Sequence, residues 1–293
     1  MSTADDPTTA TTPDLDRTGY DPTFLTVDVP LPALHTTVRE LPYVHFTVLL
    51  DPTRRLAALT AVNIDGASLL DLGRGDDWHV DERVPDDEQT GPDVYAANDL
   101  DRGHLVRRRD PVWGDRSVAA AANVDTFSFT NAAPQAAEFN QSKELWLGLE
   151  DQVLQYASTH RQRLTVFTAP VLLDDDAPYR GVRLPRRFFK VAAWTTSDGG
   201  SLRTAAYLLD QSPELEGVDL EAAFARAHEL GDPPPLGPYR TYQVPVRDIA
   251  EMTGFDLAQL AEADTLQPVP TVEPPDGIRA GWVPLTSVDQ LSF

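Results

Sequence analysis

The sequence predicts an α+β fold, and three observations lead to that class. Two apolar runs, residues 43–50 and 56–64, have the length and composition of β-strands, and the turn that begins at Asp51 predicts a hairpin between them. Residues 141–160 show the periodicity of an amphipathic helix. The other helical and strand-like stretches are interspersed without a regular βαβ alternation, which favours α+β over a doubly wound sheet.

The helix at 141–160 is the best-supported element. Leu145, Leu149 and Val153 recur four residues apart and form an apolar stripe along one face. Asn140 stands immediately before the helix, where a short polar side chain caps the first free backbone N–H groups. We therefore expect this helix to bury its apolar face against a sheet.

The remaining elements follow from shorter patterns. Residues 66–100 hold few hydrophobic side chains and many acids, which predicts a long surface excursion. Gly254 is expected to end the last helix, because glycine adopts the left-handed conformation at helix ends. Strands are expected at residues 127–130, 164–167, 188–194 and 205–209, and helices at 220–230 and 246–253.

The domain organisation is predicted from composition. Residues 1–22 are rich in Thr, Asp and Pro and nearly free of aliphatic side chains, so we expect a disordered tail. Residues 23–264 form one domain, and the Pro-rich residues 265–293 are expected to run extended and to pack on it. No internal repeat is visible.

Composition also excludes several classes of protein. The chain of 293 residues has no cysteine, so disulfides, thiolate metal sites and cysteine nucleophiles are excluded. No apolar run is long enough to cross a membrane, and the N-terminus lacks the features of a secretory signal. We therefore expect no membrane partner, and either a cytoplasmic protein or export by a route without a signal peptide.

The charge is strongly acidic, with a formal net charge of −22. Considered alone, this argues against a nucleic-acid partner, because phosphate contacts require cations. Two local basic clusters stand out, however, at residues 102–109 and 180–190. One interpretation is solvated arginines on turns, and the other is that the two clusters meet at a phosphate-binding cleft.

The strongest chemical signal lies at residues 101–104, which read Asp-Arg-Gly-His. A histidine can take a proton from water near neutral pH, and Arg102 beside it can hold a phosphate. Asn140 offers a hard carbonyl oxygen suited to hydrated Mg²⁺, and Glu150 can orient waters of the metal. Together with His104 these groups supply the base, the Lewis acid and the cation of a metal-assisted phosphodiester hydrolase.

The order of the motifs resembles a known family, the DNA/RNA non-specific endonucleases of the ββα-metal type. After Asp-Arg-Gly-His come Asn-Ala-Ala-Pro-Gln at 131–135, Phe-Asn-Gln at 139–141, Trp146, and Leu-Glu at 149–150. Residues 165–170 and 184–190 also look like strands of that family. The resemblance implies an antiparallel or mixed sheet with the metal-site helix packed against it.

The resemblance also implies a role for individual residues. His104 would be the general base, Arg102 would support the phosphate, and Glu150 would hold metal-bound waters. Asn140 would be the direct metal ligand, with Mg²⁺ as the cofactor and Mn²⁺ as a substitute. Substrate-binding residues would be Arg74, Asn131, Gln135 and Arg108, with Asn131 and Gln135 shaping the site by hydrogen bonds. Arg74 precedes Trp78 and Asp81 in a pattern similar to an Arg…Trp…Asp stretch of the family.

The function implied is a Mg²⁺-dependent endonuclease that hydrolyses DNA, and RNA as a second substrate, with little sequence preference. One alternative is a module that binds nucleic acid or a partner protein without cleavage. Another is a defence or toxin nuclease activated by a partner. Partners allowed by this hypothesis are DNA or RNA, a second copy of the chain, and an inhibitor or activator protein. Zinc hydrolases are disfavoured, because no His-x₃-His or His-Glu-x-x-His spacing occurs.

Overall fold

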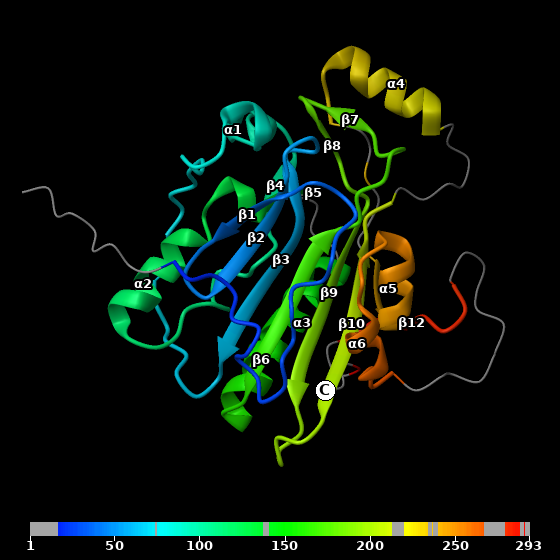
Figure 1. Cartoon of the computed structure of the whole chain (residues 1–293). Coiled ribbons are helices and arrows are strands. Elements are labelled where there is room, and N and C mark those ends of the chain that lie inside the picture. Colours follow the sequence, from blue (N-terminus) through cyan, green and yellow to red (C-terminus); the bar gives the residue numbers. More distant parts are fainter. Residues whose placement is uncertain are drawn as a thin grey trace, which may run out of the picture.

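An eight-stranded antiparallel sheet is the frame of the molecule (Figure 1). The computed structural model describes residues 17–73, 75–136, 141–212, 220–233, 236, 240–266, 279–287 and 290. The strand order is β1-β2-β3-β6-β9-β10-β11-β12. The strands are β1 (Arg39–Pro42), β2 (Phe46–Asp51), β3 (Leu56–Asp65), β6 (Arg163–Pro170), β9 (Arg187–Thr195), β10 (Leu202–Asp210), β11 (Arg240–Val244) and β12 (Val283–Leu285).

The predicted N-terminal hairpin is confirmed as β2 and β3, which pair antiparallel. The turn between them is closed by Asp51, whose Oδ1 accepts hydrogen bonds from the backbone N–H groups of Thr53 at 2.8 Å and Arg54 at 3.0 Å. Asp favours this position because its short side chain can bond to the backbone two or three residues ahead.

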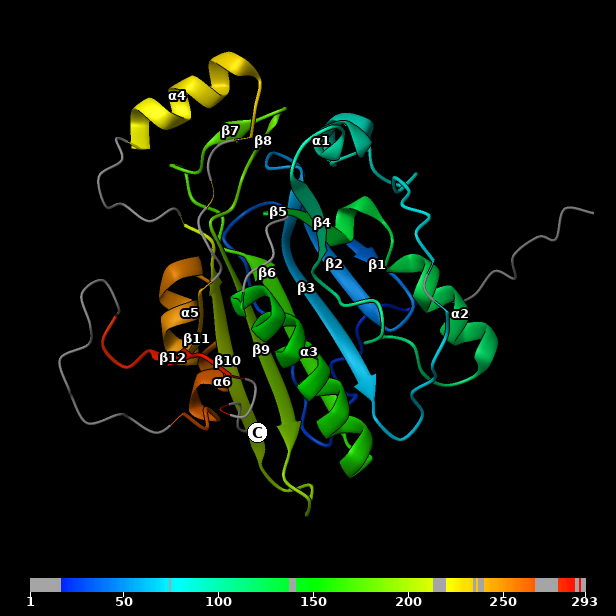
Figure 2. The ribbon, with the colours of Figure 1, turned by 180° about the vertical axis from the view of Figure 1, so that it is seen from behind.

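One face of the sheet is covered by the long helix α3 (Gln141–His160), which Figure 2 shows from behind. Its bounds confirm the sequence prediction. Leu149, Val153, Leu154 and Ala157 are all buried in one core cluster with inward side chains of the sheet. Because these positions recur with the helical period, the helix presents one apolar face and stays in place over the sheet.

The opposite face is covered by the N-terminal segment and by α5 (Val246–Thr253) and α6 (Ala258–Glu262) (Figure 1). Gly254 ends α5 in the left-handed conformation, with φ of 73°, and its N–H donates to the Ala250 carbonyl at 2.8 Å. With helices on both faces of an antiparallel sheet, the predicted α+β class is confirmed.

The N-terminal boundary lies earlier than the sequence suggested. Residues 17–22, expected in the tail, pack onto the domain: Tyr20 is 7% exposed, and its hydroxyl donates to the Val29 carbonyl at 2.6 Å. Arg17 forms an ion pair with the buried carboxylate of Asp125 at 2.8 Å. The buried ring of Tyr20 and the ion pair of Arg17 with Asp125 hold this segment on the domain. The composition of residues 1–22 did not reveal these contacts. Residues 1–16 lie outside the described part of the chain.

Several smaller elements surround this frame. The strand expected at 127–130 is wrong, because an isolated bridge at Ser128 is followed by a 3₁₀ turn. The excursion at 66–100 is largely irregular, as expected. The other elements are η1 (Asp86–Glu88), α1 (Pro92–Tyr95), β4 (Leu100–His104), α2 (Arg116–Asp125), η2 (Phe129–Asn131), β5 (Ala132–Ala136), β7 (Pro178–Tyr179), β8 (Val182–Arg183) and α4 (Leu220–Leu230).

At the C-terminal end, Trp282 and β12 pack on the domain. The Trp282 indole N–H donates to Asp248 Oδ2 at 2.8 Å, and β12 extends the sheet beside β11. The part of the predicted extended segment at 267–278 lies outside the described residues. None of the described helices has the length and hydropathy needed to cross a lipid bilayer.

Candidate active site

The Asp-Arg-Gly-His motif forms a β-strand, β4, that pairs antiparallel with β5 in a separate two-stranded ribbon. His104 lies opposite Ala132, and Arg102 lies opposite Pro134. Because side chains alternate along a strand, Arg102 and His104 emerge on one face of the ribbon, and Gly103 lies on the other. The pairing therefore gathers the predicted base and the predicted phosphate-binding arginine.

Two aromatic rings hold the imidazole of His104. Its ring centroid lies 4.7 Å from that of Trp78, with the planes tilted by 51°. It meets Phe127 edge-on at a centroid distance of 5.1 Å. The Arg102 guanidinium carbon lies 5.3 Å from the Trp78 centroid, within range of a cation–π contact. Trp78 thus supports both predicted catalytic side chains.

The opposite face of the ribbon explains why the motif contains glycine. A Cβ atom at position 103 would lie 2.2 Å from Gln135 Cδ and 2.4 Å from its Oε1. Gln135 reaches over from the diagonal position on β5 and covers the Gly103 backbone. The glycine of one motif and the glutamine of the next are therefore explained by a single packing contact.

Asn131 anchors the chain just after His104. Its side-chain carbonyl accepts the Val106 N–H at 2.8 Å, and its amide donates to the carbonyls of Val106 at 2.9 Å and Thr126 at 3.0 Å. Asn131 is 0% exposed, so it offers no surface to a substrate. These hydrogen bonds hold the loop that follows His104 in position, and the substrate-binding role expected for Asn131 stays a prediction.

One residue from each basic cluster of the sequence lies beside Glu150 on α3. Glu150 Oε2 lies 3.7 Å from Arg107 Nε, and Oε1 lies 3.5 Å from Lys190 Nζ. Arg107 comes from the first cluster and Lys190 from the second. They do not line an open cleft, because the side chains of Glu150, Arg107 and Lys190 are only 10%, 12% and 2% exposed.

A second carboxylate, Asp110, is buried close to these charges. Burial raises the pKa of Asp110 to about 7, while Lys190 and Arg107 act to lower it and Glu150 acts to raise it. We call these four residues, Arg107, Asp110, Glu150 and Lys190, the buried charge cluster. Lys190 also donates to Thr168 Oγ1 on the neighbouring strand at 2.9 Å. The cluster thus joins the loop after His104 to α3 and to the central sheet.

Arg108 connects other parts of the site. Its Nη1 donates to the Leu72 carbonyl at 2.9 Å and to Asn123 Oδ1 at 3.1 Å. Arg108 therefore fastens the 66–100 excursion to α2. The predicted substrate contacts of Arg108 and Gln135 stay predictions. Arg74 and Asn140 lie outside the described residues.

The donors that bear on the metal hypothesis are those of the described residues. Among those residues, no group of three or more His, Asp or Glu side chains could hold an ion, and the expected direct ligand, Asn140, is not among them. Glu150 fits an indirect role, because its distances to both cations exceed a normal hydrogen bond and leave its oxygens able to accept from water. Arg107 Nη1 is buried without an acceptor among the described atoms, which is typical of a donor that serves water or a ligand oxygen.

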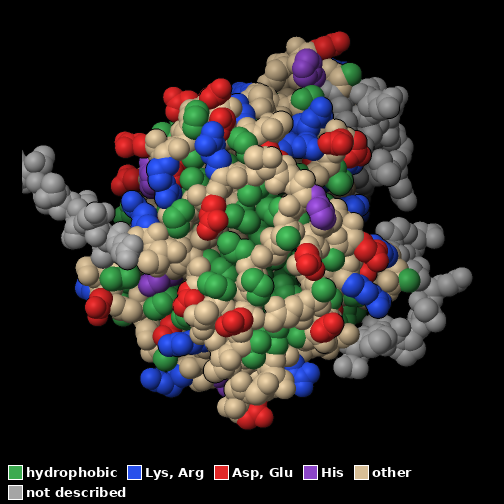
Figure 3. All heavy atoms as spheres, viewed as in Figure 1, with side chains coloured by type: hydrophobic (Ala, Val, Ile, Leu, Met, Phe, Trp, Pro, Cys, Tyr) green, Lys and Arg blue, Asp and Glu red, His purple; other side chains and the backbone are tan. Residues whose placement is uncertain are grey.

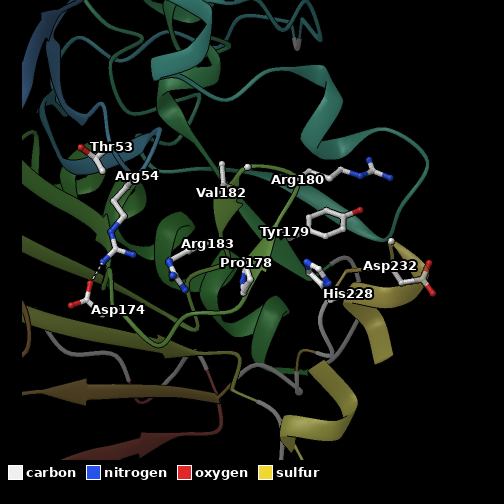
Figure 4. Close-up of a pocket in the computed structure, with 12 residues that line it drawn as sticks. Thr53, Arg54, Asp174, Pro178, Tyr179, Arg180, Val182, Arg183, His228 and Asp232 are labelled. Carbon is white, nitrogen blue, oxygen red and sulfur yellow. Dashed lines mark hydrogen bonds and ion pairs between the residues drawn. The ribbon is translucent and has the colours of Figure 1, made fainter. Parts of the chain in front are cut away.

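A sizeable cleft of the described chain lies elsewhere. Figure 4 shows this cavity of about 670 Å³, formed by the β7–β8 hairpin, the end of α4 and the β2–β3 turn. Arg54, Arg183 and His228 line it, and Arg54 is paired with Asp174 at 2.6 Å. None of the predicted site residues within the described ranges borders this cleft, so its size does not make it the active site.

Comparison with known proteins assigns the family. A sequence profile described as DNA/RNA non-specific endonuclease matches residues 31–264, which include the β4–β5 ribbon and α3. The chain belongs to the DNA/RNA non-specific endonuclease family. The family expected from the motif order is therefore confirmed.

Two curated relatives illustrate this membership. An uncharacterised protein, y4fB, of Sinorhizobium fredii is 39% identical over 277 residues, covering 85% of this chain and 40% of that protein. A protein named nuclease from Nostoc sp. is 25% identical over 186 residues, covering 63% of this chain and 60% of that protein. The chain thus spans about half the length of the curated relatives it matches.

A solved structure shows the same fold. The crystal structure described as the EndoG/EndoGI complex, on the mechanism of EndoG inhibition, aligns with a TM-score of 0.55 and 19% identity. The alignment covers 78% of this chain and 91% of that one. At this identity the likeness concerns the fold, and it confirms the expected nuclease architecture.

Sequence reasoning missed part of the site. Arg107 was counted only as a member of a basic cluster, Lys190 as a member of a cluster and of the strand at 184–190, and Asp110 was not singled out. The available signal was Lys190 itself, a lysine within the apolar run 188–194, because a lysine is almost never fully buried unless it has a partner. Nothing local in the sequence indicates that Glu150 is that partner.

Proposed function

We propose that this protein is a metal-dependent endonuclease that hydrolyses phosphodiester bonds of DNA and RNA with little sequence preference. The observation that carries the proposal is the β4–β5 ribbon, which presents Arg102 and His104 on one face over Trp78 in a chain of the non-specific endonuclease family. We propose Mg²⁺ as the cofactor, with Mn²⁺ able to replace it and Asn140 as the direct ligand.

His104 acts as the general base. The imidazole takes a proton from a water molecule as its oxygen attacks the phosphorus atom, and the bond from phosphorus to the 3′ oxygen breaks to leave a 5′ phosphate. The contacts with Trp78 and Phe127 restrict the imidazole plane, so its orientation is set before the substrate binds.

Arg102 and Glu150 support the charges of the reaction. Arg102 is exposed on the face of the ribbon that carries His104, where its guanidinium can hold the negative phosphate. A divalent cation held by Asn140 would supply Lewis-acid stabilisation of the negative charge that develops on the phosphate oxygens. Glu150, which lies 3.7 Å from Arg107 Nε and 3.5 Å from Lys190 Nζ, orients waters in the site.

The test is digestion of supercoiled plasmid and of an unstructured RNA by the purified protein in Mg²⁺, with and without EDTA. His104→Ala is compared with His228→Ala, which removes an exposed histidine on α4. We expect cleavage by the wild type and by His228→Ala, and at least a hundredfold loss for His104→Ala and in EDTA.

Two results would contradict the proposal. Activity that survives complete chelation would rule out the metal-dependent mechanism. An inactive wild type, across several divalent metals and at low salt, would favour a module that binds nucleic acid without cutting it, which a binding measurement with the same substrates would then reveal.

A further inference from the structure

The buried charge cluster contains more charge than protein interiors usually accept. Lys190 is 2% exposed, and Asp110 is 4% exposed. Removing charged groups from water costs free energy unless good partners compensate. A neutral packed core would fill the same space at lower cost, so the cluster requires an explanation beyond stability.

The geometry of the cluster converges on one carboxylate. Lys190 approaches Glu150 from the central strand β9, and Arg107 approaches it from the loop three residues after His104. Each cation is itself held by another group. Lys190 donates to Thr168 Oγ1 at 2.9 Å, and Arg107 Nη2 pairs with Asp151 Oδ1 at 2.5 Å. Glu150 is therefore placed between two fixed positive charges.

Glu150 is held by ion pairs with the two cations rather than by short hydrogen bonds to them. Glu150 lies 3.5 Å from Lys190 and 3.7 Å from Arg107, which is ion-pair distance without a short hydrogen bond. Arg107 Nη1 is buried and has no acceptor among the described atoms. A buried donor in this state is normally satisfied by water or by a ligand oxygen. Both features fit a carboxylate that is held in place while its oxygens serve other groups.

We propose that Arg107 and Lys190 are positioning residues that hold Glu150 in its working orientation from opposite sides. This inference rests on the proposed function, because it assigns Glu150 a part in the phosphodiester reaction. Neither cation touches the substrate in this role. Both act through Glu150, and the loop that carries Arg107 couples that orientation to His104.

The test is a double-mutant cycle on the turnover number. Glu150→Gln, Lys190→Met and Arg107→Met are measured alone, and each cation variant is then combined with Glu150→Gln. We expect each single cation variant to lower kcat by about 10- to 100-fold with little change in KM. In the Glu150→Gln background, removal of Lys190 or Arg107 should cost less than threefold further, because the group they position is already lost.

Controls separate positioning from folding. Arg187→Met removes a cation from the same strand β9 that pairs with Asp210 at 3.2 Å rather than with Glu150, and it should leave kcat within threefold of wild type. Lys190→Arg retains the charge and should recover part of the activity. The melting temperature of the metal-free protein gives a readout that does not depend on activity. Lys190→Met should lower it more in the wild type than in Glu150→Gln.

The outcomes are distinct. Losses of kcat that multiply in the double variants would show that the cations act independently of Glu150 and would overturn the proposal. Equal lowering of the melting temperature in both backgrounds would also overturn it. If the wild type cleaves no substrate, the proposed function fails, and the melting cycle still decides whether Lys190 and Glu150 are coupled.

Discussion

Individual contacts decide how the motif residues work. Gln135 covers the backbone of Gly103, and Asn131 bonds to the backbone of Val106, two residues after His104, and of Thr126. Neither residue carries charge, yet each restricts the strand or loop next to the imidazole. Residues conspicuous in the motif therefore include those that shape the backbone as well as those that react.

Substitution of Gly103 by Ala should displace the Gln135 side chain. The atoms nearest the new Cβ belong to the movable side chain of Gln135 rather than to backbone, so we expect a loss at the low end of about 1–3 kcal/mol in the free energy of unfolding and a fall in cleavage rate. Urea unfolding and plasmid digestion measure the two effects. Adding Gln135→Ala should restore much of the stability, because it removes the overlapping atoms. A double variant as unstable as Gly103→Ala alone would contradict this explanation.

Asp110 should make stability depend on pH. Its folded pKa, about 7, is raised above the ordinary aspartate value, so the folded state holds a proton that the unfolded state releases at lower pH. The contribution of Asp110 is therefore fully present below about pH 4 and is lost as pH rises through about 7. The charged groups facing it are Lys190, Arg107 and Glu150.

Asp110→Asn tests this effect, because the amide stays neutral at every pH. We expect the variant to lose less stability than the wild type between pH 5 and about pH 8, measured by urea unfolding of the metal-free protein. Asp28→Asn, at an exposed position, should follow the wild-type pH profile. Parallel profiles for Asp110→Asn and the wild type would show that Asp110 ionises normally in the folded state.

At the scale of elements, α3 links the core to the chemistry. Leu149, Val153 and Ala157 fasten it to the sheet, while Glu150 turns toward Arg107 and Lys190. Adjacent residues of a helix point about 100° apart, so one turn can place Leu149 in the core and Glu150 beside the two cations. The β4–β5 ribbon is joined to α3 through Arg107, which follows β4 in the chain and pairs with Glu150. A displacement of α3 is therefore expected to move Glu150 relative to Arg107 and so to change the geometry of the candidate site.

Leu149→Ala should lower both stability and activity. The side chain is 0% exposed, so its loss leaves a cavity and is expected to cost about 2–5 kcal/mol of unfolding free energy. Cleavage at saturating substrate should also fall, because Glu150 is the next residue. Gln155→Ala, at an exposed position of the same helix, should change stability by less than about 0.5 kcal/mol. If the Leu149→Ala variant is destabilised but fully active, the position of α3 does not control the cleavage rate.

At the scale of the whole molecule, the net charge of −22 opposes a polyanionic substrate. On the face shown in Figure 3, acidic and basic side chains are interspersed around a central hydrophobic area. The buried charge cluster uses Arg107 and Lys190 internally, so these cations do not form an open basic surface. In the proposed nuclease, binding of nucleic acid would therefore depend on the local field near Arg102 and on the proposed metal ion.

Salt should weaken substrate binding steeply. For the proposed nuclease, we expect the association constant of His104→Ala for duplex DNA to fall linearly on a log–log plot against salt, by about 0.9 per phosphate contact. Fluorescence anisotropy across roughly 50–200 mM salt measures the slope. Arg102→Met should reduce the slope by about 0.9, the value of one phosphate contact. Arg187→Met should leave the slope unchanged, because Arg187 is paired with Asp210. A flat response to salt would exclude phosphate contacts as the source of affinity.

Prediction from sequence succeeded where the signal is local. The bounds of α3 follow from periodicity, and the β2–β3 hairpin follows from the turn at Asp51, although β2 begins at Phe46, three residues after the expected start. The strand expected at 127–130 was wrong, because the backbone N–H of Phe129 bonds to His79 and that of Asn131 turns back to Ser128. The β4–β5 ribbon was not expected, since the Asp-Arg-Gly-His strand shows no alternation of apolar and polar residues. Its partner strand lies far along the chain.

The sequence by itself determined the family, the α+β class and the identity of the motif residues, because these depend on residue order and short-range periodicity. Only the tertiary structure decided that Gln135 covers Gly103 and that Arg107 and Lys190 meet at Glu150. Those contacts join segments that are far apart in the sequence. The order of the strands in the sheet and the packing of α3 against the sheet bring these segments together. Burial then gives the ion pairs their strength, since charges interact more strongly away from water.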